Sequence, residues 1–269
     1  MTEMLQYPFM QRALIAGLLI SVCAALVGVP LVLRKNSMIG DGLSHTAFSA
    51  FALATVLGFA PIGFALPVVV LASFFVLRLS KNRKIHGDAA IGVLSASSLA
   101  IGTFAISVSK GVNIDLNSYL FGSILSVSWL DVLSSAVLTL FALGLYLFAY
   151  HRIFAITFDE DFAKSVGVKT EIYDVLFAAI CSVVIVLGMR LLGSLLISSL
   201  VIFPTLSAMR LCRTFKGVIV ASIVVSIIAF VVGLMMSYAF STPTGATIVL
   251  ANLAVFILTT IYGKIAKQN

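Results

Sequence analysis

The chain has 269 residues, of which 61% are hydrophobic and 10% are charged, and its formal net charge is +7. A soluble domain carries about 25% charged residues, so this composition excludes an ordinary soluble protein and indicates an integral membrane protein. The cations fall in loops between apolar runs, as in basic membrane proteins, and do not indicate nucleic-acid binding. The three cysteines form no CxxC pair, so neither a disulfide framework nor a thiolate metal site is indicated.

Apolar runs along the chain predict about nine transmembrane helices, because one span needs roughly 20 apolar residues. The Gly/Pro turn signals GFAPIG (58–63) and STPTG (241–245) each divide a long run into two passes. We expect an all-α polytopic protein with one transmembrane domain over residues 1–269. A tenth piece, residues 116–130, is too short to span and predicts a re-entrant or interfacial helix. The predicted spans are 13–33, 42–58, 61–77, 89–109, 132–149, 172–189, 191–209, 218–240 and 244–263.

The distribution of Lys and Arg predicts the orientation of the chain. Fourteen of the 17 lie in one set of alternate loops, which includes the longest loop at residues 150–171. The opposite set holds Arg12, Lys110 and Arg190. Because cytoplasmic loops carry the excess of cations, we expect the N-terminus outside and the C-terminus and the 150–171 loop inside. The first apolar run is too long for a cleavable signal peptide.

The stretch RKNSMIGDGLSH at 34–45 separates two long runs without charge. Asp41 and His45 are four residues apart, so on a helix they share one face. Carboxylate and imidazole are ligands that suit Zn²⁺, Mn²⁺ and Fe²⁺, and two ligands are fewer than a stable zinc site has. The alternatives are that Asp41 is the N-cap of a helix beginning near Gly42 and that His45 is a polar residue packed between helices.

The loop at 150–171 predicts a short amphipathic helix over residues 158–167. Acidic residues at its start favour the positive end of the helix dipole, an apolar stripe follows, and a glycine ends it. Such a helix is either a connector on the membrane surface or a docking element for a partner. The residues that define this helix are Asp159, Glu160, Phe162, Ala163, Val166 and Gly167.

Other polar residues support weaker hypotheses. Asp115, in an external loop, can receive a cation or remain a solvated loop residue. Arg190 can pair with lipid headgroups or with a docked protein. Ser44, Ser97, Ser98, Ser198 and Ser199 can line a polar pathway or bond across helices, and we favour helix packing.

Several stretches resemble one known family. The segment LVLRKNSMIGDGLSHTAFSA is similar to the signature of permease subunits of metal-uptake ABC transporters, the family for zinc, manganese and chelated iron. DEDFAKSVGV resembles the coupling helix that such permeases insert into the ATPase subunit, and GSLLISSLVIFPTLSAMRL resembles the span that follows it. NIDLNSYLFGSILSVS is similar to the external segment of the zinc-type members.

The resemblance implies a fold like that of vitamin-B12-type importers, with fewer helices. It also implies a bacterial cytoplasmic-membrane location, two permease copies around one pathway on the dimer axis, a cytoplasmic ABC ATPase dimer and an extracytoplasmic metal-binding protein. ATP would be bound by the partner, and no permanent cofactor is expected. The chain itself has no GxxxxGK[ST] phosphate-binding pattern, so we expect a translocation subunit and not an enzyme.

These observations predict the permease of an ATP-driven divalent-metal importer, with Zn²⁺ the first candidate and Mn²⁺ the next. Asp41 and His45 are the predicted metal contacts. The alternative is a proton-coupled secondary transporter of a cation or small solute, for which several acids within the spans would be expected. Asp41 is essentially the one acid of this kind, and it lies near the end of a span.

Overall fold

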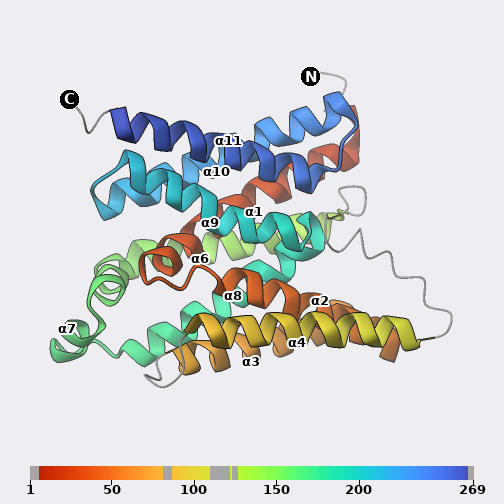
Figure 1. Cartoon of the computed structure of the whole chain (residues 1–269), viewed down its shortest axis with the longest axis horizontal. Coiled ribbons are helices and arrows are strands. Elements are labelled where there is room, and N and C mark those ends of the chain that lie inside the picture. The colour runs from red at the N-terminus through yellow and green to blue at the C-terminus, as the bar shows by residue number, and fades with distance from the viewer. Residues whose placement is uncertain (1–5, 81–86, 110–121, 123–126, 266–269) are drawn as a thin grey trace.

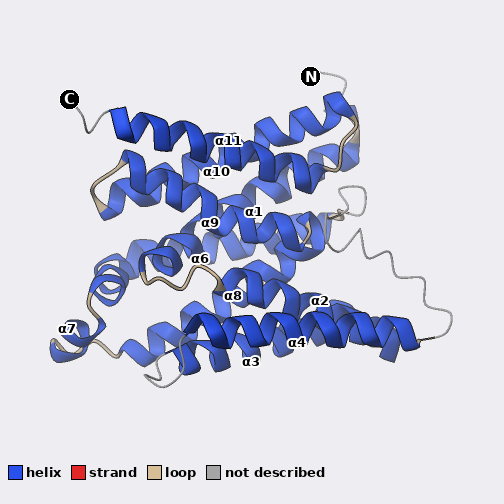
Figure 2. Ribbon diagram, viewed as in Figure 1, coloured by secondary structure: helices blue, strands red, loops and turns tan. Residues whose placement is uncertain are grey.

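The computed structural model describes residues 6–80, 87–109, 122 and 127–265. Within these ranges the regular structure is helical throughout, as Figure 2 shows. The predicted all-α class is therefore confirmed. The helices are α1 (Pro8–Leu33), α2 (Ile39–Leu57), α3 (Pro61–Ser80), α4 (Gly87–Val108), α6 (Trp129–Phe158), α7 (Glu160–Ser165), α8 (Thr170–Leu192), α9 (Ser194–Leu211), α10 (Phe215–Phe240) and α11 (Thr244–Ile265).

Eight of the described helices are long and apolar enough to cross a membrane. The helix α2 corresponds to the predicted span 42–58 but is not among the eight. Its first half carries Asp41, Ser44, His45 and Thr46, which lower its hydropathy. Most of the side chains of α2 are buried inside the protein, so this helix does not need the apolar surface of a lipid-facing span.

The start of α1 and the end of α11 lie at opposite ends of the helical bundle (Figure 1). This placement agrees with an odd number of passes and hence with α2 as a ninth crossing. The helix α1 passes through the middle of the bundle, and Ile20, Cys23 and Val29 on it are fully buried. The short helix α7 lies at the margin of the bundle, where the chain passes from the end of α6 to the start of α8 (Figure 1).

Small residues let the central helices approach closely. A Cβ atom at Gly28 on α1 would overlap the carbonyl oxygen of Val201 on α9. A Cβ atom at Gly233 on α10 would likewise overlap the backbone of Ile248 on α11. Membrane helices associate through such small-residue contacts because lipid offers them no hydrophobic driving force.

The helix α6 is longer than predicted at both ends. Its N-cap is Ser128, whose hydroxyl accepts from the Asp131 amide while the Asp131 carboxylate accepts from the Ser128 amide. At the other end the helix continues to Phe158, so residues 150–158 are helical and not the start of a loop. Most of the predicted 116–130 helix lies outside the described residues, and its last two residues begin α6.

Candidate metal and coupling sites

Asp41 lies inside the first turn of α2, because this helix begins at Ile39 with Met38 as its N-cap. No side chain caps the helix. The alternative that Asp41 is the N-cap is therefore wrong. The carboxylate is nevertheless placed where the helix dipole favours negative charge, so its position in the first turn costs the helix little.

His45 follows Asp41 by one turn, and 3.7 Å separates His45 Nε2 from Asp41 Oδ2. The side chains of His45 and Asp41 are 22% and 38% exposed, respectively. The other ring nitrogen, Nδ1 of His45, is buried and has no hydrogen-bond partner in the described part of the chain. An oxygen and a nitrogen atom that could both bind a metal ion thus lie side by side on one helix face. They are too far apart for a hydrogen bond of ordinary length.

Hydroxyl groups connect this part of α2 to its neighbours. Ser44 Oγ donates to the Asp41 carbonyl oxygen at 2.7 Å and lies 3.3 Å from Ser198 Oγ on α9. Thr46 Oγ1 lies 3.2 Å from Ser98 Oγ on α4. The predicted bonding across helices is confirmed for Ser44, Ser98 and Ser198, whereas Ser97 and Ser199 donate to carbonyl oxygens of their own helices. The cross-helix hydroxyl pairs connect α2 to α4 and to α9 close to Asp41 and His45.

Among the described residues there is no cluster of three or more His, Cys, Asp or Glu side chains that could hold a metal ion. One chain therefore offers a two-ligand pair, fewer than the three protein ligands of a catalytic zinc site or the four of a structural one. The chemistry of the pair suits a divalent transition metal, and water or a second copy of the chain would have to supply the remaining ligands. Asp115, the predicted external cation contact, lies outside the described residues.

The predicted amphipathic helix is present as α7, shorter than the expected 158–167. Its N-cap is Asp159, whose carboxylate accepts from the Phe162 amide at 2.8 Å. Gly167 follows with φ +84°, a left-handed conformation that glycine adopts without steric cost. The chain then turns back, with the Val168 amide donating to the Ala163 carbonyl at 3.0 Å.

Two exposed apolar side chains lie on α7 and at its C-cap. Phe162 is 59% exposed and Val166 is 58% exposed. Ala163, by contrast, is fully buried. The expectation that Ala163 contributes to a docking surface is corrected by this burial, because a side chain packed within its own chain cannot contact a partner.

Arg34, at the C-terminal end of α1, joins three helices. Its Nη2 lies 3.0 Å from Glu160 Oε2 on α7, and its Nη1 lies 3.0 Å from Asp174 Oδ1 on α8. Glu160 also pairs with Lys164 at 2.9 Å. The hydrogen bond to Glu160 and the Glu160 charge raise the pKa of Lys164. Sequence reasoning counted Arg34 only as a cytoplasmic cation, because its partners lie 126 and 140 residues away.

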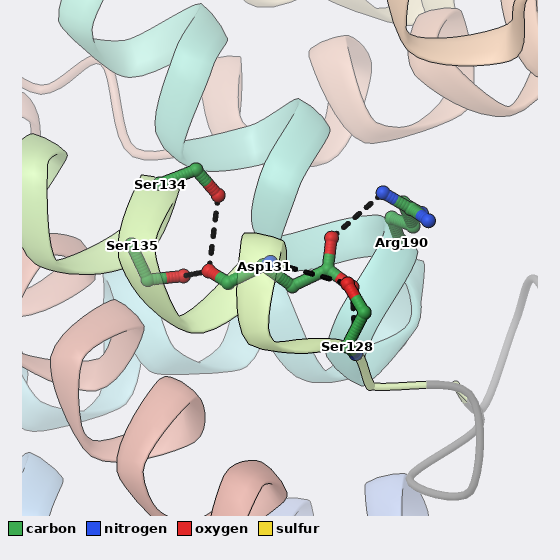
Figure 3. A network of polar contacts seen from close by, with 5 residues as sticks. All are labelled: Ser128, Asp131, Ser134, Ser135 and Arg190. Carbon is green, nitrogen blue, oxygen red and sulfur yellow. Dashed lines mark hydrogen bonds and ion pairs between the residues drawn. The ribbon is translucent and has the colours of Figure 1, made fainter.

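Another ion pair joins α6 to α8 (Figure 3). Arg190 Nη1 lies 2.7 Å from Asp131 Oδ1, and the Asp131 side chain is 3% exposed. The Ser128 amide and hydroxyl also donate to this carboxylate, at 2.9 and 2.7 Å. Arg190 thus has a partner within the chain, so neither lipid nor a docked protein is needed to explain it.

Comparison with known proteins places this architecture in one family. The model of the ABC 3 transport family matches residues 6–263. The chain belongs to this family. The predicted membership in the metal-uptake ABC permease group is thereby confirmed, as is a multi-pass protein of the bacterial cytoplasmic membrane.

Individual members of the family match over almost their whole length. The manganese import system permease protein ScaB of Streptococcus gordonii is 32% identical, over 94% of this chain and 90% of ScaB. The high-affinity zinc uptake system membrane protein ZnuB of Haemophilus influenzae is 26% identical, over 91% and 94%. Among solved structures, PsaBC from Streptococcus pneumoniae in complex with Fab aligns with a TM-score of 0.83 and 30% identity, covering 95% of this chain and 92% of that one.

Proposed function

We propose that this chain is the permease subunit of an ATP-driven importer of a divalent transition-metal ion, Zn²⁺ or Mn²⁺, and that the ion contacts Asp41 and His45 in transit. Membership in the ABC 3 transport family supports the transport class. Relatives named for manganese import and zinc uptake support the substrate class. The observation that carries the proposal is the Asp41–His45 pair, 3.7 Å apart.

A pair of only two ligands suits a transient contact with a transported ion better than a site that retains the ion. A site that passes an ion must bind it strongly enough to admit it and weakly enough to release it. A carboxylate and a neutral imidazole give one negative charge and one nitrogen ligand, and waters or a second permease copy on the dimer axis complete the coordination. Because Nδ1 of His45 has no hydrogen-bond partner among the described residues, no such bond to them fixes the orientation of the ring.

The energy for transport comes, in this proposal, from a separate cytoplasmic ATPase dimer that binds α7. The exposed Phe162 and Val166 form the apolar part of the contact, and Gly167 reverses the chain after it. An extracytoplasmic metal-binding protein delivers the ion to the opposite side of the membrane. Two permease copies surround the pathway.

Reconstitution tests this function directly. The chain is co-purified with its proposed partners, an ABC ATPase and a metal-binding protein, and placed in proteoliposomes, and uptake of radiolabelled Zn²⁺ and Mn²⁺ is measured. The proposal expects uptake that requires ATP and is unaffected by a protonophore. Uptake that collapses with the proton gradient and continues without ATP would instead establish a proton-coupled secondary transporter.

A further inference from the structure

We propose that Arg34 is a positioning residue for transport, which transmits the movement of α7 to the metal-binding pair on α2. This inference rests on the proposed function, because it assumes that a partner ATPase moves α7. The structural basis is that one guanidinium group contacts both α7 and α8 at the point where the chain leaves α1 toward α2.

The contacts of Arg34 are divided between its two terminal nitrogens. Nη2 pairs with Glu160 and Nη1 with Asp174, each at 3.0 Å. The three side chains are only 16%, 23% and 12% exposed, in the order Arg34, Glu160 and Asp174. Ion pairs shielded from solvent are screened less than surface pairs, and the planar guanidinium fixes the relative positions of two carboxylates as a single ammonium cannot.

The backbone after Arg34 forms a short, internally bonded connection to α2. Lys35 adopts the left-handed conformation with φ +60°, and its amide donates to the Val32 carbonyl at 3.1 Å. The Asn36 amide donates to the Leu31 carbonyl at 2.8 Å. These two bonds form a Schellman motif, which ends α1 in one defined geometry.

The same connection reaches the first turn of α2. The Ile39 amide donates to the Asn36 carbonyl at 3.1 Å, and the Gly42 amide donates to the Met38 carbonyl at 3.1 Å. Asp41 lies within this turn. A displacement of Glu160 therefore has a continuous route through Arg34 and a hydrogen-bonded loop of five residues to the metal-binding face of α2. Energetic coupling between two sites is carried by chains of packed side chains, by hydrogen-bond and ion-pair networks and by rigid helices.

Arg34 could instead serve only as one of the cytoplasmic cations that orient the chain. Lys35 is the matched control for this alternative, because it is the next residue and carries the same charge. Among the described residues Lys35 makes no side-chain ion pair. A topological role would make the two cations equivalent, whereas a positioning role requires Arg34 alone.

The experiment compares R34K, R34Q and K35Q in the reconstituted complex with its ATPase and metal-binding protein. Metal uptake and ATP hydrolysis are measured in the same proteoliposomes, and their ratio is the readout. We expect R34Q to lower uptake per ATP hydrolysed about tenfold, within the range typical of coupling between two sites. R34K should lie between R34Q and the wild type, and K35Q should match the wild type.

A double variant connects the effect to the ion pair itself. If Arg34 acts through Glu160, then R34Q combined with E160Q should be no worse than either single change, since residues of one network are not additive. E160Q alone supplies the same test if R34Q does not insert into the membrane.

A wild-type uptake-to-hydrolysis ratio in both R34Q and E160Q would overturn the inference while leaving the proposed function intact. An equal defect in R34Q and K35Q would also overturn it, in favour of topology. Absence of ATP-dependent uptake in the unmodified complex would overturn the proposed function itself.

Discussion

Arg190 on α8 and Asp131 on α6 form an ion pair, with 2.7 Å between Arg190 Nη1 and Asp131 Oδ1. R190A would leave a buried carboxylate with Ser128 as its remaining partner. We expect a loss of about 2 kcal/mol in the free energy of unfolding, the usual cost of leaving a buried polar group short of a partner. The measurement is the unfolding equilibrium of the purified protein in detergent.

The control for this pair is R12A. Arg12 is half-buried, and its one hydrogen bond to a described residue goes to the Pro8 carbonyl of its own helix, at 3.2 Å and exposed to solvent, so its loss should change the stability by less than about 0.5 kcal/mol. Adding D131N to R190A should recover part of the loss, because the uncompensated charge is then removed. Equal stability of R190A and R12A would contradict this account of the pair.

Close packing of α1 against α9 depends on Gly28. G28A would force the added methyl into the Val201 carbonyl, and overpacking of this kind costs about 1–3 kcal/mol. The matched control is G144A on α6, where a Cβ atom meets nothing within 4 Å. That change should stabilise the helix by up to about 1 kcal/mol. Thermal unfolding of both variants in the same detergent compares the two effects, and a tolerated G28A would show that the helices separate easily.

The apolar surface of α7 is predicted to bind the ATPase. F162D should abolish co-purification of the ATPase without destabilising the permease, since Phe162 is 59% exposed. A163D does not test docking, because it places a charge at a fully buried position and would disrupt α7 itself. S165A, which changes an exposed polar residue of the same helix, should retain the ATPase. Retention of the ATPase by F162D would exclude Phe162 from the interface.

The charge distribution predicts the orientation of the chain in the membrane. In a variant lacking Cys23, Cys181 and Cys212, a single cysteine at Ala60 lies in the α2–α3 turn, which is predicted to be outside. A single cysteine at Lys164 lies on α7, which is predicted to be inside. An impermeant thiol reagent added to intact cells should label position 60 and reach position 164 only after permeabilisation. The reverse pattern would invert the topology.

The turns between spans could be predicted from the sequence because the residues that form them have special conformations. Gly58, in the GFAPIG turn, has φ +75°, and Ser241, in the STPTG turn, has φ +53°. Apolar runs were less informative about helix ends that leave the membrane. The helix α6 continues past His151 and Arg152 to Phe158, since a helix outside lipid needs no apolar side chains.

The candidate sites were predictable only where they are local in sequence. The spacing of Asp41 and His45 correctly placed them one turn apart, but the beginning of α2 at Ile39 removed the capping role. The burial of Ala163 and the contacts of Arg34 with Glu160 and Asp174 depend on how α7 packs against α6 and α8. No local pattern encodes contacts between residues more than 100 positions apart.

The proposed passage of metal past Asp41 and His45 is the central claim, and D41N tests it most directly. Asn preserves the shape of the side chain but removes its charge, and no capping bond is lost because Asp41 is not the N-cap. H45Q removes the imidazole in the same way. The measurement is ATP-dependent uptake of radiolabelled Zn²⁺ and Mn²⁺ by the reconstituted complex, normalised to the amount of assembled permease and ATPase. The account predicts that both variants assemble normally and lose most of their uptake, and wild-type rates in both would contradict it.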